Sequence, residues 1–253
     1  MSAASTRRHR ERTATTDTSP GRAQPPREQC HGPDQEGPAT LSELLRDRAQ
    51  ENPDGPAVVI GPPGIRRQAM SYSDLFGAAH ALSGHLTMHL EVRESALILL
   101  DRGALLPTAM FAALIAGLVA IPASVSAFAR DRSLARHLLD QCRPEAILTT
   151  RVAFPLLEDS GYPLILLDEL TGGAPQQARR RPLPADPAYV EHAERGAGLG
   201  CRTITHQHAL ALLAGGRGRE PYTTELLAPI YHGTAIHLGT AKPPGAPSTA
   251  PEG

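Results

Sequence analysis

The sequence has no tryptophan, 4% aromatic residues and three cysteines among its 253 residues. Cys30, Cys142 and Cys201 lie far apart and show no CxxC spacing. This pattern argues against a disulfide framework and indicates free thiols in a reducing compartment, so we expect a cytoplasmic protein. The formal net charge is -1. A net charge this close to zero gives no reason to expect nucleic acid or an anionic membrane surface as a partner.

Charged residues are also missing from one long stretch, between Gly103 and Ala129. A membrane-spanning helix needs only ~20 apolar residues, so this stretch is long enough to cross a membrane. Pro107, Gly117 and Pro122 interrupt it, however. We therefore predict a buried helix followed by a buried strand, and no membrane span. No apolar run follows the arginines near the N-terminus, which argues against a secretory signal.

Both ends of the chain are poor in large aliphatic residues. Residues 1–38 are rich in Arg, Ser, Thr, Pro, Gly and Gln, and residues 242–253 in Pro, Ala and Gly. Such segments bury too little apolar area to offset their ordering entropy, so we expect two disordered tails. We therefore predict that residues 39–241 form one domain.

Within that domain, helix and strand periods alternate. Thr40 and Glu43 have capping-box spacing ahead of a helix that we expect to end near Asn52. Further helices are predicted at 71–86, 105–116, 131–141 and 151–159, and strands at 57–60, 96–100, 118–121, 146–149 and 164–167. A loop at 172–186 with exposed Arg179, Arg180 and Arg181, a short strand at 189–190 and a glycine-rich turn at 196–200 follow, before a helix near Gln207. Apolar strands separated by helices predict an α/β fold whose parallel sheet is covered on both faces.

The order of these elements resembles the adenylate-forming (AMP-binding) superfamily, and within it the fatty acyl-AMP ligases. The resemblance runs from about Thr40 to Thr240, and its best part begins with ALILLDRGALLPTAMFAALIAGLVAIPA at Ala96. It implies the N-terminal part of that fold, and an ATP-dependent reaction that activates a fatty acid as its acyl adenylate. ATP and Mg2+ are the cofactors that the resemblance implies. An acyl or peptidyl carrier protein, or a chain that completes the fold, is the partner that it implies.

The segment HAERGAGLGCRTITHQHAL, which begins at His192, is similar to the phosphate-binding loop of that family. Its matching positions are three glycines and a Thr-His step, namely Gly196, Gly198, Gly200, Thr205 and His206. The family's loop hydroxyls are replaced, and Gly200 or Cys201 stands where its lysine is expected. Glu194 adds a negative charge near the expected phosphates. These changes predict a degenerate nucleotide site with no catalytic residue of its own.

A second matching segment, LAPIYHGTAIHLG, is similar to the family's apolar strand that ends beside the acyl pocket. It makes Tyr231 and His232 candidates for that pocket. The family's later motifs, including its C-terminal catalytic lysine, do not follow, so we expect an incomplete large domain that is inactive alone.

Other kinds of chemistry have weaker support. His206 and His208 lack a companion Cys, Asp or Glu at metal-ligand spacing, so no metal site is predicted. Cys201 next to Arg202 has no base placed with it, and no Gly-x-Ser-x-Gly elbow is present. Three hypotheses remain: an acyl-AMP ligase relative that needs another chain, a non-catalytic binding or interaction protein derived from that fold, and a gene remnant without a stable fold.

Overall fold

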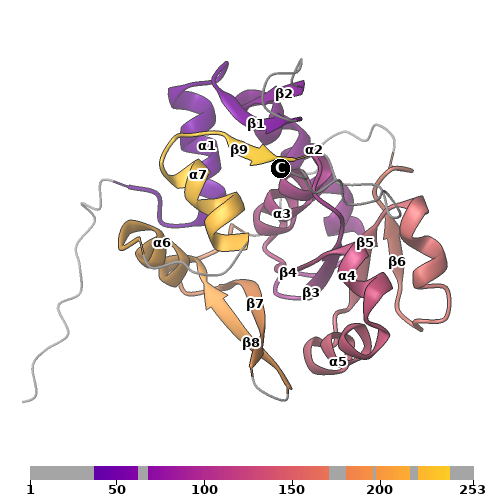
Figure 1. Cartoon of the computed structure of the whole chain (residues 1–253). Helices are drawn as coiled ribbons and strands as arrows, with labels where there is room; N and C mark the ends of the chain where they lie inside the picture. The colour runs from indigo at the N-terminus through magenta and orange to yellow at the C-terminus, as the bar shows by residue number, and fades with distance from the viewer. Residues whose placement is uncertain (1–36, 62–67, 171–180, 196–197, 217–221, 240–253) are drawn as a thin grey trace, which may run out of the picture. The chain divides into compact units, whose positions relative to one another are not determined.

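The computed structural model describes residues 37–61, 68–170, 181–195, 198–216 and 222–239 (Figure 1). The chain divides into two units at Gly37, and the fold below is that of the second. Almost all of the two expected tails, together with Arg179 and Arg180, lies outside the described residues. Arg181 is described and is exposed, as predicted.

A six-stranded sheet forms the centre of the fold, in the order β6-β5-β3-β4-β7-β8. Its strands are β3 (Ser95–Leu99), β4 (Val119–Ala123), β5 (Ala146–Thr149), β6 (Leu164–Leu166), β7 (Pro187–Arg195) and β8 (Gly198–Thr205). The first five strands in that order run parallel, which confirms the α/β class. One edge departs from the parallel arrangement, because β8 pairs antiparallel to β7 as a hairpin. A short connection allows this pairing, whereas parallel strands need a crossover of a dozen residues or more.

Both faces of this sheet are buried, as predicted from its apolar strands. Successive residues of a strand point to opposite faces, so Ala96 and Ile98 enter one hydrophobic cluster while Leu97 and Leu99 enter another. The helices α1 (Leu41–Glu51), α2 (Tyr72–His89) and α3 (Leu105–Ala116) contribute to the larger cluster. The smaller cluster takes residues from α4 (Val125–Arg130), α5 (Arg132–Cys142) and the region of the 3-10 helix η1 (Arg151–Leu156).

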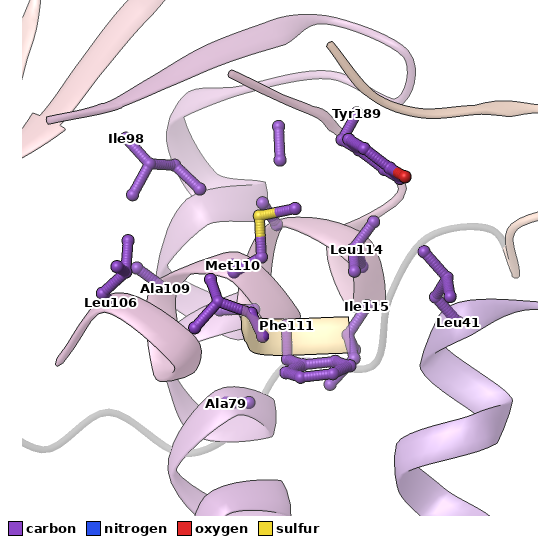
Figure 2. Packing of buried hydrophobic residues seen from close by; sticks show 14 of the residues in the cluster. Leu41, Ala79, Ile98, Leu106, Ala109, Met110, Phe111, Leu114, Ile115 and Tyr189 are labelled. Carbon is purple, nitrogen blue, oxygen red and sulfur yellow. The ribbon is translucent and has the colours of Figure 1, made fainter. Parts of the chain in front are cut away.

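Helix α3 is buried almost all round, which explains its lack of charge. Met110, Phe111 and Leu114 are 0% exposed and lie among residues of α2, β3 and β7 (Figure 2). Gly117 ends the helix with φ 74, a left-handed conformation in which a Cβ is strained. Among the described helices, none is long and apolar enough to cross a membrane.

A smaller sheet joins the two ends of the described fold. Its order is β2-β1-β9, where β1 (Pro56–Ile60) pairs antiparallel with β2 (Gln68–Ser71) and parallel with β9 (Ile236–Leu238). The sequence predicted β1 but not its two partners.

The described residues between β8 and β9 form α6 (His206–Ala214), the π-helix η2 (Thr223–Leu227) and α7 (Ala228–Tyr231). The expectation of an apolar strand before Tyr231 is therefore wrong. Pro229 lies in the first turn of α7, which follows η2 without a break.

Candidate functional site

The carboxyl edge of the large sheet contains a point where the chain changes direction. From β3 the chain continues to β4 on one side, and then returns to β5 on the other side of β3. In open α/β sheets, ligands bind outside the carboxyl ends of the strands at such a switch point. The residues that follow β3 and β4 therefore define the first candidate region.

Polar side chains are connected at this switch point. Asp101 follows β3, and its Oδ1 accepts hydrogen bonds from the Ser124 hydroxyl (3.0 Å) and from the Ser126 N–H (3.1 Å). Arg102 forms a 2.5 Å ion pair with Glu225 of η2. The switch point thus connects the β3 and β4 ends to the π-helix. Sequence reasoning missed these residues, although polar residues directly after two apolar strands were a usable signal.

Tyr222, at the start of η2, faces the same group of charges. Burial raises the pKa of Tyr222 to about 12, while the charge of Arg102 acts in the opposite direction. Its ring lies 6.3 Å from the ring of His192 on β7, measured between centroids. The His192 Nε2 lies 2.6 Å from the Pro122 carbonyl oxygen. A carbonyl only accepts, so Nε2 carries the proton and donates it.

The predicted phosphate-loop segment forms the β7–β8 hairpin, drawn in orange in Figure 1. Gly198 pairs with Arg195, and Gly200 pairs with Ala193, so both glycines lie in strand β8 rather than in a turn. Gly196 lies outside the described residues. Because β7 runs parallel to β4, the end of β7, after which the hairpin reverses, lies at the same carboxyl edge of the sheet as Ser124.

The Thr-His step lies at the other end of β8, where α6 begins. Thr205 is the N-cap of α6, and its Oγ1 accepts a 3.2 Å hydrogen bond from the His208 N–H. His206 is 1% exposed, and its Nδ1 accepts a 3.2 Å hydrogen bond from the Leu41 N–H at the start of α1. Burial lowers the pKa of His206 to about 4, although the nearby Asp186 acts in the opposite direction. This histidine is therefore neutral at pH 7 and joins two helices.

One face of the hairpin carries a buried polar network. The Tyr189 hydroxyl lies 2.8 Å from the Thr223 hydroxyl, which donates to Glu191 Oε1 at 2.8 Å. Glu191 Oε2 forms a 2.7 Å ion pair with Arg202 on β8. Tyr189 and Thr223 are 0% exposed, and burial raises the pKa of Tyr189. The network ties the hairpin to η2, and Arg202 is held against a carboxylate.

Of the acyl-pocket candidates, Tyr231 is the last residue of α7 and His232 is its C-cap. Tyr231 is partly buried and His232 is exposed, and their rings meet edge to face with centroids 5.2 Å apart. Arg48 of α1 donates to the carbonyl oxygens of Ile230 (3.1 Å) and Tyr231 (2.5 Å). These contacts fix the end of α7 against α1.

The described residues contain no group of three or more His, Cys, Asp or Glu side chains that could hold a metal ion. The whole chain contains a single lysine, Lys242, which lies outside the described residues.

Comparison with known proteins identifies the family. The model of the AMP-binding enzyme family matches residues 45–195, and the chain belongs to this family. No curated protein sequence matches the chain.

Solved structures show which fold the chain shares. It is similar to a fatty acid AMP ligase from Legionella pneumophila, with TM-score 0.69 and 17% identity, over 82% of this chain and 41% of that one. A fatty acyl-adenylate ligase from L. pneumophila, in complex with acyl adenylate and pyrophosphate, gives TM-score 0.65 and 17% identity, over 80% and 40%. The structure of McyG A-PCP complexed with phenylalanyl-adenylate gives TM-score 0.65 and 14% identity, over 78% and 36%.

The chain thus spans about 40% of the length of the acyl-adenylate ligases that it resembles. It matches the N-terminal part of their fold, as its sequence predicted.

Proposed function

We propose that this chain is a relative of the acyl-AMP ligases which, as these 253 residues, does not activate a carboxylate. One observation carries the proposal: the N-terminal part of the fold is kept, while the segment expected to hold the phosphates has no lysine and has Ala193, Glu194, Arg195 and Ala197 in the region of the family's loop hydroxyls. The only lysine of the chain, Lys242, is far from that segment in sequence. No catalytic residue is assigned.

The described side chains do not fit the phosphates of ATP. The Thr205 hydroxyl is engaged in capping α6, and His206 is buried against α1. Arg202 could supply a cation, but it is paired with Glu191. Among the described residues, no three or more His, Cys, Asp or Glu side chains are grouped so that they could hold a metal ion such as Mg2+. Gly196, Gly198 and Gly200 remain proposed as a degenerate nucleotide-binding segment.

Loss of phosphate donors predicts a large loss of rate. Removing a single preorganised donor to a developing charge typically costs ~10²–10³ in rate, and here several are replaced. We therefore expect no acid-dependent ATP–pyrophosphate exchange by the purified chain, over a panel of short and long fatty acids.

One outcome of the exchange assay would contradict the proposal. Robust exchange that disappears in His232→Ala but persists in His237→Ala would refute the proposal and support the acyl-pocket role of Tyr231 and His232. His237 is the matched control because both histidines are exposed. In that case Arg195 and Arg202 are the first candidates for the missing cation.

A non-catalytic binding role is the second candidate, favoured by a retained core around an altered loop. One of the similar structures is an adenylation-carrier pair, McyG A-PCP. We propose a carrier protein, or a chain that completes the fold, as the partner. Titration calorimetry with ATP, and separately with a carrier protein, distinguishes the two candidates: ATP binding favours a residual nucleotide site, and carrier binding without ATP favours the interaction role.

A further inference from the structure

Two of the three cysteines meet in the folded chain. Cys142 is the last residue of α5, and Cys201 lies on β8, 59 residues later. Their Sγ atoms are 3.5 Å apart, and both are free thiols. Nothing in the spacing of the cysteines along the sequence indicates this contact.

The strand pairing explains why the thiols face each other. Along β8, Cys201 and Arg202 point to opposite faces, so Arg202 reaches Glu191 while Cys201 points toward α5. Cys142 packs against the smaller hydrophobic cluster and is partly buried, whereas Cys201 is exposed. The two sulfurs of a disulfide are about 2.05 Å apart, so closure requires an approach of roughly 1.5 Å. Side-chain rotation together with a small shift of the hairpin supplies such a distance.

We propose that Cys142 and Cys201 form a reversible disulfide, which ties the β7–β8 hairpin to α5 when the chain meets a small-molecule disulfide oxidant. The bond would hold the second face of the hairpin, since the Tyr189–Thr223–Glu191 network already holds the first. The proposal does not depend on whether the hairpin binds a nucleotide.

The exposure of the two thiols sets the order of the exchange steps. The Cys201 thiolate attacks the oxidant R–S–S–R, forming Cys201–S–S–R and releasing one RS⁻. Cys142 then loses its proton to solvent and attacks the Cys201 sulfur, which releases the second RS⁻. Two thiols have lost two electrons and two protons, and one R–S–S–R has become two RSH. Cys142 is the slower thiol, because burial raises its pKa to about 12, with further increases from the hydrogen bond and charge of Cys201. Conversion of Cys201 to the mixed disulfide removes that charge.

The test uses the full chain with Cys30→Ser, so that only the pair remains. The protein is equilibrated in glutathione buffers of increasing oxidised fraction, quenched with acid, and labelled with a maleimide that shifts its gel mobility. We expect both thiols to disappear together, in a monomer that has lost two hydrogen atoms in mass and yields one cross-linked peptide pair. The oxidised chain should also unfold at a higher urea concentration than the reduced chain.

Single variants provide the matched controls. Cys142→Ser and Cys201→Ser, each in the Cys30→Ser background, should stop at a glutathione mixed disulfide on the remaining cysteine. Cys142→Ala replaces Cys142→Ser if circular dichroism shows that the serine variant is unfolded. Independent glutathione adducts on both cysteines of the pair, or disulfides formed only between molecules, would overturn the proposal.

Discussion

His206 makes the fold sensitive to acid, because its ring is buried in the neutral form. Its Nδ1 must stay unprotonated to accept the hydrogen bond from the Leu41 N–H. Its pKa is about 4 in the fold, compared with 6.5 for an unperturbed histidine. The unfolded chain therefore binds this proton more readily than the folded chain does. The stability that the neutral ring contributes is fully present above pH 6.5 and is lost as the pH falls toward 4.

The size of the effect follows from the difference between the two pKa values. A shift of one unit corresponds to 1.36 kcal/mol, so lowering the pH from 7.5 to 4.5 should cost the fold about 2.5 kcal/mol through this group. Urea unfolding followed by far-ultraviolet circular dichroism at the two pH values measures the loss. Other groups also titrate in this range, so the informative quantity is the difference between the wild type and His206→Asn. That variant offers an amide oxygen as acceptor and does not titrate.

His208→Asn is the matched control, since His208 is exposed on the same helix. It should keep the full acid sensitivity of the wild type. His206→Leu should lower stability by ~1–3 kcal/mol already at pH 7.5, because the Leu41 N–H is left without an acceptor. If His206→Asn lost as much stability between the two pH values as the wild type, the assigned protonation state of the buried ring would be incorrect.

Two further predictions concern the core and the buried network. Met110→Ala should cost about 2–5 kcal/mol of unfolding free energy, because Met110 is 0% exposed, whereas Met88→Ala should cost little because Met88 is 52% exposed. Equal losses in urea unfolding would contradict the packing around α3. Tyr189→Phe and Thr223→Val should each destabilise by ~1–3 kcal/mol, since each removes hydrogen bonds from the buried network around the Glu191 carboxylate. The double variant should lose less than the sum of the two single losses, with a coupling of about 0.5–3 kcal/mol, and strict additivity would show that the two hydroxyls do not interact.

Local pattern was sufficient for much of this fold. Helix α3 has the bounds that its uncharged run predicted, and β5 has the bounds that its apolar run predicted. Short or unusual elements were not predicted, because their hydrophobic pattern is weak. Strand β2 has four residues with exposed or partly exposed side chains, and α7 has four residues including a proline. A matching family motif also misled, since the segment before Tyr231 is helical here.

Long-range contacts could not be derived from the sequence. The partner of His206 is 165 residues away, and the partner of Cys142 is 59 residues away. The resemblance placed His206 beside a nucleotide because Thr205 and His206 match the family's Thr-His step. In the structure the same residue satisfies a backbone donor of α1, a role that depends on how distant helices pack.

The pairing of the chain's early and late segments also has a consequence for synthesis. Three contacts of early segments need residues that are synthesised much later. The Leu41 N–H needs His206 as acceptor, Arg48 needs the carbonyl oxygens of Ile230 and Tyr231, and β1 needs β9 as its parallel partner. At a translation rate of about 5–20 residues per second, the ribosome needs roughly 10 to 30 s to add the residues between Leu41 and His206. During that interval α1 lacks its contacts with α6 and α7, although its other neighbours α2 and α3 have already been synthesised. A chaperone that binds nascent chains would therefore have this interval in which to cover the part of α1 that α6 and α7 later contact.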